Sequence, residues 1–149
     1  MQTFLPYPSF ERSAQVLDRQ RLGKQRVEGF QILKSLLLGG GWQHHPATKQ
    51  WATHENALCD YITAMCNEWT DRGYQDSIVI KVRDLLAEHP LRISIYPWWL
   101  GYVPYHSSHR ANLLRKDPVH YGQFGWTEDP SDPYYWPSHH SSFNPTAAE

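Results

Sequence analysis

The chain has 149 residues, with 14 Lys and Arg against 15 Asp and Glu, and 14% of its residues are aromatic. This length suits one domain that buries roughly two-thirds of the surface its unfolded chain exposes, and it leaves little for a second domain. The formal net charge of -1 excludes a general attraction to nucleic acid or to an anionic membrane, so any such attraction must come from a local patch.

The first ten residues, MQTFLPYPSF, contain two prolines among aromatic and apolar side chains. This pattern predicts an extended arm that packs across the body of the protein. No basic stretch leads into an apolar run here, and no apolar run elsewhere approaches the length of a membrane span. We therefore expect a cytoplasmic protein that does not bind membranes, in which Cys59 and Cys66 are small buried apolar groups.

The first predicted helix covers residues 19–38. Asp18 is a good N-terminal cap, and the glycines at 39–41 end the element. Between them, apolar residues such as Leu22 and Leu33 recur near the helical period.

A second helix is predicted over residues 47–72, because Pro46 suits a first turn and apolar residues follow at spacings of three, four and seven up to Gly73. A shorter third helix follows Ser77 and ends before Pro90.

Downstream, two prolines interrupt RISIYPWWLGYVPYH, which predicts a packed loop. A last short helix is expected from Ser107 or Ser108 to Lys116. The tail, residues 127–149, has four prolines and no Lys or Arg, which predicts an irregular aromatic-rich segment draped over the surface. We expect a single, mainly α domain over residues 1–149, with about three main helices and a short C-terminal helix.

The stretch LDRQRLGKQRVEGFQIL, residues 17–33, concentrates positive charge around one acid, Glu28. On a helix, Arg21, Gln25 and Glu28 share a face. The helix dipole disfavours cations at an N-terminal end, and a bound anion would resolve this conflict. The alternative is a solvated face with an ion pair between Lys24 and Glu28. Arg26 falls on the apolar side, so we expect it to be partly buried and paired.

A second basic group lies in HSSHRANLLRKDPVHY and contains Arg110, Arg115 and Lys116. Folded against the first helix, it would complete a groove for a phosphodiester backbone. The nine histidines raise a metal site as an alternative, with candidate ligands His45, His106, His109 and His120. Their spacing matches no recognised metal-binding pattern, so hydrogen-bonded histidines or phosphate donors are the commoner explanations. No nucleotide-binding or dinucleotide-binding motif occurs, and we expect no cofactor.

Taken in order, LDRQRLGKQRVE, TDRGY and HSSHRANLLRKDPVHY resemble the pyrimidine-dimer DNA glycosylase (phage endonuclease V-like) family, and in particular a bacterial branch of it. The resemblance implies a helical fold and a reaction in which the α-amine of the chain attacks the sugar carbon of a damaged nucleotide. A glutamate on the first helix supports the resulting imine, and elimination then cuts the strand. An α-amine has a reference pKa of about 8, so part of it is a free nucleophile near neutral pH.

Carried over by motif, the resemblance implies Met1 and Glu28 as catalytic residues, since the bulky Gln2 should leave Met1 in place. It further implies that Arg115 is the arginine of the last helix. The full set of expected nucleic-acid contacts is Arg19, Arg21, Lys24, Arg26, His45, His106, His109, Arg110, Arg115 and Lys116.

The leading hypothesis is a monomeric DNA glycosylase and AP lyase that acts on damaged or modified pyrimidines in duplex DNA. Two alternatives remain open at this point. One is a non-catalytic nucleic-acid or nucleotide binding module of the same fold. The other is a metal-dependent enzyme on a modified nucleobase that uses a cluster of histidines.

Overall fold

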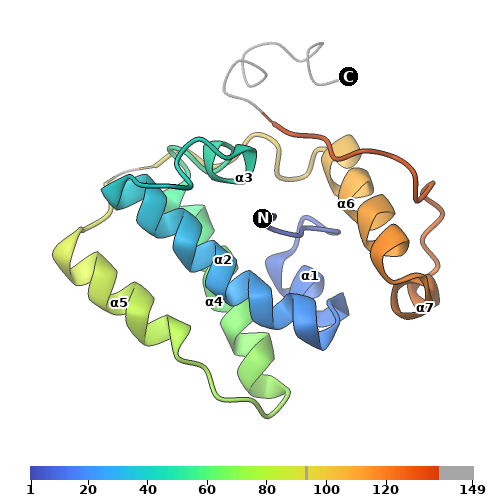
Figure 1. The fold of residues 1–149 in the computed structure, drawn as a ribbon, viewed down its shortest axis with the longest axis horizontal. Coiled ribbons are helices and arrows are strands. Elements are labelled where there is room, and N and C mark those ends of the chain that lie inside the picture. The colour runs from blue at the N-terminus through green and yellow to red at the C-terminus, as the bar shows by residue number, and fades with distance from the viewer. Residues whose placement is uncertain (93, 138–149) are drawn as a thin grey trace.

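The computed structural model describes residues 1–92 and 94–137, and Figure 1 shows the arrangement of their helices. No strand occurs in these residues, which confirms the mainly α fold. In chain order the elements are α1 (Phe10–Val16), α2 (Arg19–Leu38), α3 (Pro46–Lys49), α4 (Glu55–Asp71), α5 (Ile78–Glu88), α6 (Val103–Lys116), α7 (Pro118–Tyr121) and the 3-10 helix η1 (Gly122–Phe124).

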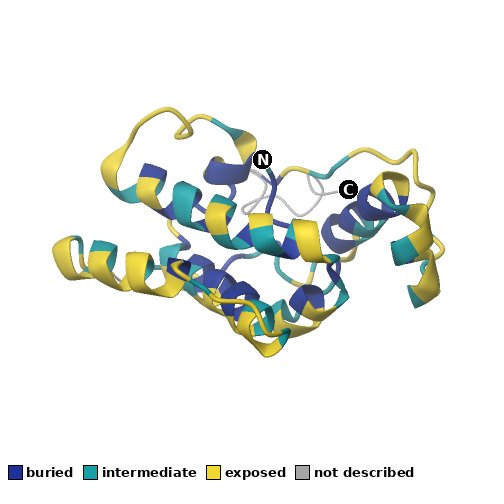
Figure 2. Cartoon of the chain, turned by 60° about the horizontal axis from the view of Figure 1, so that its bottom comes forward, coloured by how far each residue is buried: buried dark blue, intermediate teal, exposed yellow. Residues whose placement is uncertain are grey.

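The core is built around the crossing of α2 and α4, and α5 packs against both helices. The two helices approach closely at Gly29, where an added Cβ would lie 2.7 Å from Cγ1 of Ile62. Ile62 is 1% exposed, so it has no room to move aside. Figure 2 shows the buried residues of these helices turned toward the interior and the exposed residues turned outward.

The start of α2 is fixed as predicted by Asp18. Its carboxylate accepts hydrogen bonds from the backbone N–H of Arg21 at 3.3 Å, from the Arg21 guanidinium at 3.0 Å and from the hydroxyl of Tyr121 in α7. Burial alone would raise the pKa of Asp18, but the hydrogen bonds from Tyr121 and Arg21 outweigh it and lower the pKa. This cap therefore ties the start of α2 to α7, 103 residues further along the chain.

The prediction of one continuous helix over residues 47–72 is wrong. The chain forms α3 and α4 instead, because Thr53 between them has a φ of 67°. A residue in this left-handed region cannot continue a right-handed helix.

The helix α6 begins earlier than predicted, at Val103. Pro104 lies in its first turn, where a missing N–H costs nothing, so this proline starts the helix instead of breaking it. As a result His106 and His109 both lie on α6, three residues apart.

The N-terminal arm packs across the body as predicted. Residues 2–6 are buried, and Figure 1 shows the N-terminus in the middle of the molecule, between α2 and α6. Residues 127–137 form no helix, and they are held along α6 by hydrogen bonds to Ser108 and from Asn112. The rest of the predicted tail lies outside the described residues. Within the described chain, none of the helices has the length and apolar character needed to cross a membrane.

Arg26 is partly buried and paired, as predicted from its place on the helix. Its guanidinium pairs with Asp76, just before α5, and lies 4.3 Å from the ring centroid of Trp69 in α4. Burial alone would raise the pKa of Asp76, but hydrogen bonds from the backbone N–H of Val79 and from Arg26 outweigh it and lower the pKa. Arg26 therefore joins α2 to the segment before α5 through an ion pair and to α4 through a cation–π contact.

We expect Asp76→Asn to lower the free energy of unfolding by about 3 kcal/mol at pH 7, because the Arg26 guanidinium then loses its buried counter-charge. The pKa of Asp76 is lowered in the folded state, so its contribution is present above the ordinary carboxyl value of about 4 and is lost as the pH falls below it. Urea unfolding at pH 7 and pH 3 should show a smaller difference between variant and wild type at pH 3.

The matched control is Asp84→Asn on α5, whose carboxylate is 70% exposed in a loose pair with Arg83. This change should have little effect on stability. Equal losses in the two variants would contradict a special role of the buried pair.

Candidate active site

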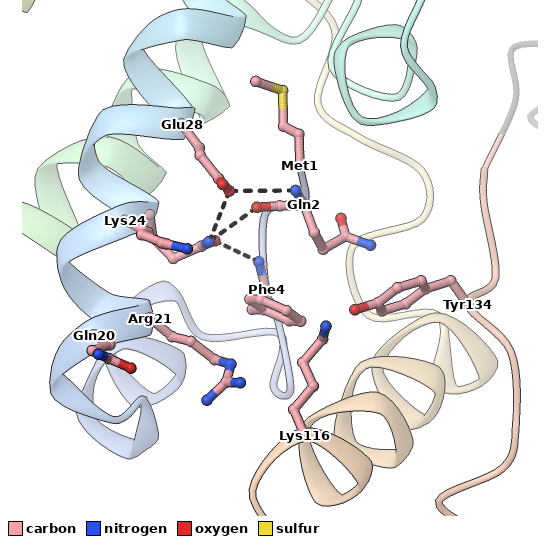
Figure 3. Close-up of a pocket in the computed structure, with 10 residues that line it drawn as sticks. Met1, Gln2, Phe4, Gln20, Arg21, Lys24, Glu28, Lys116 and Tyr134 are labelled. Carbon is pink, nitrogen blue, oxygen red and sulfur yellow. Dashed lines mark hydrogen bonds between the residues drawn. The ribbon is translucent and has the colours of Figure 1, made fainter.

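A cavity of about 280 Å³ lies between α2, the N-terminal arm and α6. Figure 3 shows Glu28 on α2 facing the arm, Lys116 reaching in from α6 and Tyr134 bordering it from the tail. The lining residues are Met1, Gln2, Phe4, Gln20, Arg21, Lys24, Gln25, Glu28, Lys116 and Tyr134. The cavity thus brings together both predicted catalytic residues and three of the predicted cations.

Glu28 is in direct contact with the arm. The backbone N–H of Gln2 donates to Oε2 of Glu28 at 3.4 Å. Only two atoms of Met1 separate the Gln2 nitrogen from the α-amine, so covalent geometry places the amine within about 7 Å of this oxygen. The amine and the carboxylate therefore belong to one site.

Gln25 joins Glu28 to the arm, and the sequence analysis did not identify it as a site residue. Its Nε2 donates to Oε2 of Glu28 at 3.3 Å and to the carbonyl of Gln2 at 3.0 Å. Its Oε1 accepts from the backbone N–H of Phe4 at 2.7 Å. The signal that could have identified it is its helical position, since it shares a face with Arg21 and Glu28. Gln2, Phe4, Gln20 and Tyr134 also line the cavity, but no sequence pattern marked them.

The cations of the cavity differ in how firmly they are held. Arg21 is fixed by Asp18, whereas Lys24 and Lys116 are exposed, and neither forms an ion pair with another described residue. Lys24 and Glu28 also line a second, more open hollow of about 500 Å³ on the neighbouring side of α2, together with Arg19 and Trp69. Positive charge therefore flanks Glu28 on both sides.

His45 lies close to the site. Burial and the charge of the N-terminal amine lower the pKa of His45, while Glu28 acts in the opposite direction. Its Nδ1 accepts from the backbone N–H of Ala47 at 3.0 Å and so caps α3. The ring also packs in a T-shaped arrangement with Trp136, with centroids 6.2 Å apart.

His106 and His109 are buried, at 3% and 0% exposure, and hold Leu5 of the arm. The Leu5 carbonyl lies 2.7 Å from Nδ1 of His106, and the Leu5 N–H donates to Nδ1 of His109 at 2.8 Å. Burial, with a smaller effect of His106, lowers the pKa of His109 to about 3, so this ring is neutral. Nε2 of His106 accepts from the N–H of Gly101 at 2.8 Å, which leaves its Nδ1 as the donor to Leu5. Neither ring lines the cavity, so we leave both out of the proposed DNA contacts.

Besides Arg21, three predicted arginines have structural partners. Arg110 pairs with Glu128 at 2.8 Å and donates to the carbonyl of Pro6 at 2.7 Å. Arg115 is exposed and donates to Asn112 and to the carbonyl of Pro130. Arg26 forms an ion pair with Asp76. None of these three arginines lines the cavity.

The histidines that the structure describes do not gather as a metal site would require. Among residues 1–92 and 94–137 there is no group of three His, Cys, Asp or Glu side chains that could hold a metal ion. His120, the remaining candidate ligand, has its Nε2 2.8 Å from the carbonyl of Val16.

Comparison with known proteins adds one finding. Searches of curated proteins and of solved structures gave no match. A sequence model of the family described as pyrimidine dimer DNA glycosylase matches residues 1–81, which contain the arm, α1 to α4 and the first residues of α5. Both Met1 and Glu28 fall within this match. The chain therefore belongs to the pyrimidine dimer DNA glycosylase family.

Proposed function

We propose that this protein is a DNA glycosylase and AP lyase that acts on damaged or modified pyrimidines through a Schiff base to the Met1 α-amine. The family supports a DNA glycosylase function in general terms and a DNA substrate. The observation that carries the finer proposal is that Met1 and Glu28 line one cavity, with Lys24 and Lys116 beside them.

The reaction follows from these groups. The lone pair of the free Met1 amine attacks C1′ of the nucleotide, the bond from C1′ to the base breaks, and the base leaves with a proton. The sugar ring then opens as its oxygen takes a proton, which gives an imine between Met1 and C1′. Loss of a proton from C2′ expels the 3′-phosphate and cuts the strand, and water releases the amine. The carboxylate of Glu28 stabilises the protonated imine and accepts and returns protons.

The cations beside the cavity are suited to binding the DNA backbone. Lys24, Lys116 and Arg19 are exposed, and the helix that carries Lys24 faces the helix that carries Lys116 across the cavity. Phosphates bound to these side chains would bring a nucleotide sugar to the Met1 amine. No observation favours the metal-dependent alternative, since both ring nitrogens of His106 and one of His109 are occupied by backbone groups.

The mechanism predicts a covalent adduct. Incubation with an oligonucleotide that contains a pyrimidine dimer or an abasic site, with borohydride present, should reduce the imine and link the protein to DNA. Peptide mapping should locate the link at Met1. A link at Lys24 or Lys116, the two lysines that line the cavity, would contradict the assignment of the nucleophile while keeping a lyase.

We expect Glu28→Gln to lower turnover by about 100-fold to 10,000-fold while DNA affinity changes little. Turnover and the dissociation constant should be measured on the same abasic duplex. The control is Glu55→Gln at the start of α4, which does not line the cavity. A pure binding module would show no adduct in the wild type and only a modest change in affinity in either variant.

Lys116→Gln should weaken binding to DNA of any sequence and reduce the slope of log affinity against log salt by about 0.9, because one phosphate contact is lost. Fluorescence anisotropy at several salt concentrations measures this slope. Lys81→Gln, an exposed lysine on α5 that does not line the cavity, is the control and should leave the slope unchanged.

A further inference from the structure

The side chain of Gln25 is only 1% exposed, so its hydrogen-bond partners must come from the protein. All of its donor and acceptor groups have such a partner. Its Oε1 accepts from the Phe4 N–H at 2.7 Å and from the Tyr61 hydroxyl at 2.5 Å, and that hydroxyl shares its one hydrogen with the Phe4 carbonyl at 3.0 Å. Its Nε2 donates to the Gln2 carbonyl at 3.0 Å and to Glu28 at 3.3 Å. Two donor hydrogens and two acceptor positions are the full capacity of an amide, so this side chain is saturated.

The partners fix the orientation of this amide. A flipped amide would direct its NH₂ group at the N–H of Phe4, which is a donor. It would also direct its oxygen at the Gln2 carbonyl and the Glu28 carboxylate, which are acceptors. Because three contacts would become repulsive, only the observed orientation satisfies the site.

The same amide therefore holds two parts of the site that are far apart in sequence. It binds the arm backbone on both sides of Thr3, through the Gln2 carbonyl and the Phe4 N–H, and it binds the carboxylate of Glu28. The α-amine is one residue before Gln2, so the position of the arm determines the position of the amine. A misplacement of about 1 Å at such a site can lower a rate by about 100-fold.

We propose that Gln25 is the positioning residue that sets the Met1 amine and the Glu28 carboxylate in register for imine formation. This inference rests on the proposed function, because it assigns Gln25 a role in that same reaction. Gln25 itself does not touch the reacting atoms. It acts through the arm on one side and through the carboxylate on the other.

A second buried glutamine, Gln50, helps to distinguish two effects: linking the arm to Glu28, and only holding the arm in place. Gln50 is 3% exposed, and its Nε2 donates to Oγ1 of Thr3 at 2.8 Å. No hydrogen bond joins its side chain to Glu28 among the described residues. Gln50 therefore holds the same stretch of the arm as Gln25 but does not link it to the carboxylate.

The test compares single-turnover rates of borohydride-trapped adduct formation on an abasic duplex, with the dissociation constant measured in parallel. Gln25→Leu removes the whole amide. Gln25→Glu keeps an acceptor for the Phe4 N–H but replaces the donor that faces Glu28, so it remains informative if the first variant does not fold. We expect the rate to fall by about 100-fold in both variants, with the dissociation constant within about threefold of the wild-type value.

Gln50→Ala is the control. It should lower the melting temperature as Gln25→Leu does, while the single-turnover rate stays within about threefold of the wild type. The proposal is overturned if the Gln25 variants keep the wild-type rate, or if Gln50→Ala loses as much rate as they do.

A second readout does not require catalysis, so it separates this proposal from the proposed function. In ¹H–¹⁵N spectra, Glu28→Gln should shift the side-chain NH₂ signals of Gln25 and the backbone signal of Gln2, because both groups donate to Glu28. If the wild type forms no adduct, the proposed function fails, and the spectra alone decide whether Gln25 joins the arm to Glu28. Unchanged signals would show that the link is absent in solution.

Discussion

An extended chain segment buried without a neighbouring strand has to find partners for its backbone groups among side chains, because an unpaired buried N–H or C=O is costly. The arm, residues 2–6, is such a segment, and much of the structure follows from this constraint. Its backbone groups bind side chains from α2, α4 and α6. These side chains are Gln25, Glu28, Tyr61, His106, His109 and Arg110.

This constraint explains why so many polar residues of α6 take no part in the cavity. His109 must be neutral to accept the N–H of Leu5, and His106 must be neutral to accept the N–H of Gly101 while it donates to the Leu5 carbonyl; burial lowers the pKa of both rings. Arg110 is held by the carbonyl of Pro6 and by Glu128. Of the residues of α6, only Lys116 at its C-terminal end lines the cavity. The family match ends at residue 81, so the wall formed by Lys116 and Tyr134 lies beyond it.

Local patterns predicted what local forces determine. The bounds of α2 follow from the Asp18 cap and the glycines at 39–41, and the pairing of Arg26 follows from its position on the apolar side of that helix. Long-range packing determines the features that the sequence patterns missed: the break between α3 and α4, the start of α6 and the partners of the arm. The left-handed Thr53 divides a stretch whose apolar spacing suits one helix, and a proline such as Pro104 suits a helix start as well as a break. The partners of Leu5 are more than 100 residues away in sequence, and no pattern in the sequence pairs them.

The basic residues fall into two groups, those that form ion pairs within the fold and those that are exposed around the cavity. Arg21, Arg26, Arg72 and Arg110 pair with carboxylates that are at most 20% exposed, so these cations stabilise the fold and add little field outside it. The exposed cations around the cavity are few, in a chain whose net charge is -1. Attraction to undamaged DNA through so few phosphate contacts is weak and is reduced by salt. On the proposed mechanism, discrimination depends on how well a nucleotide fits between the Met1 amine and the Glu28 carboxylate, which makes the rigidity of the arm a condition for selectivity as well as for rate.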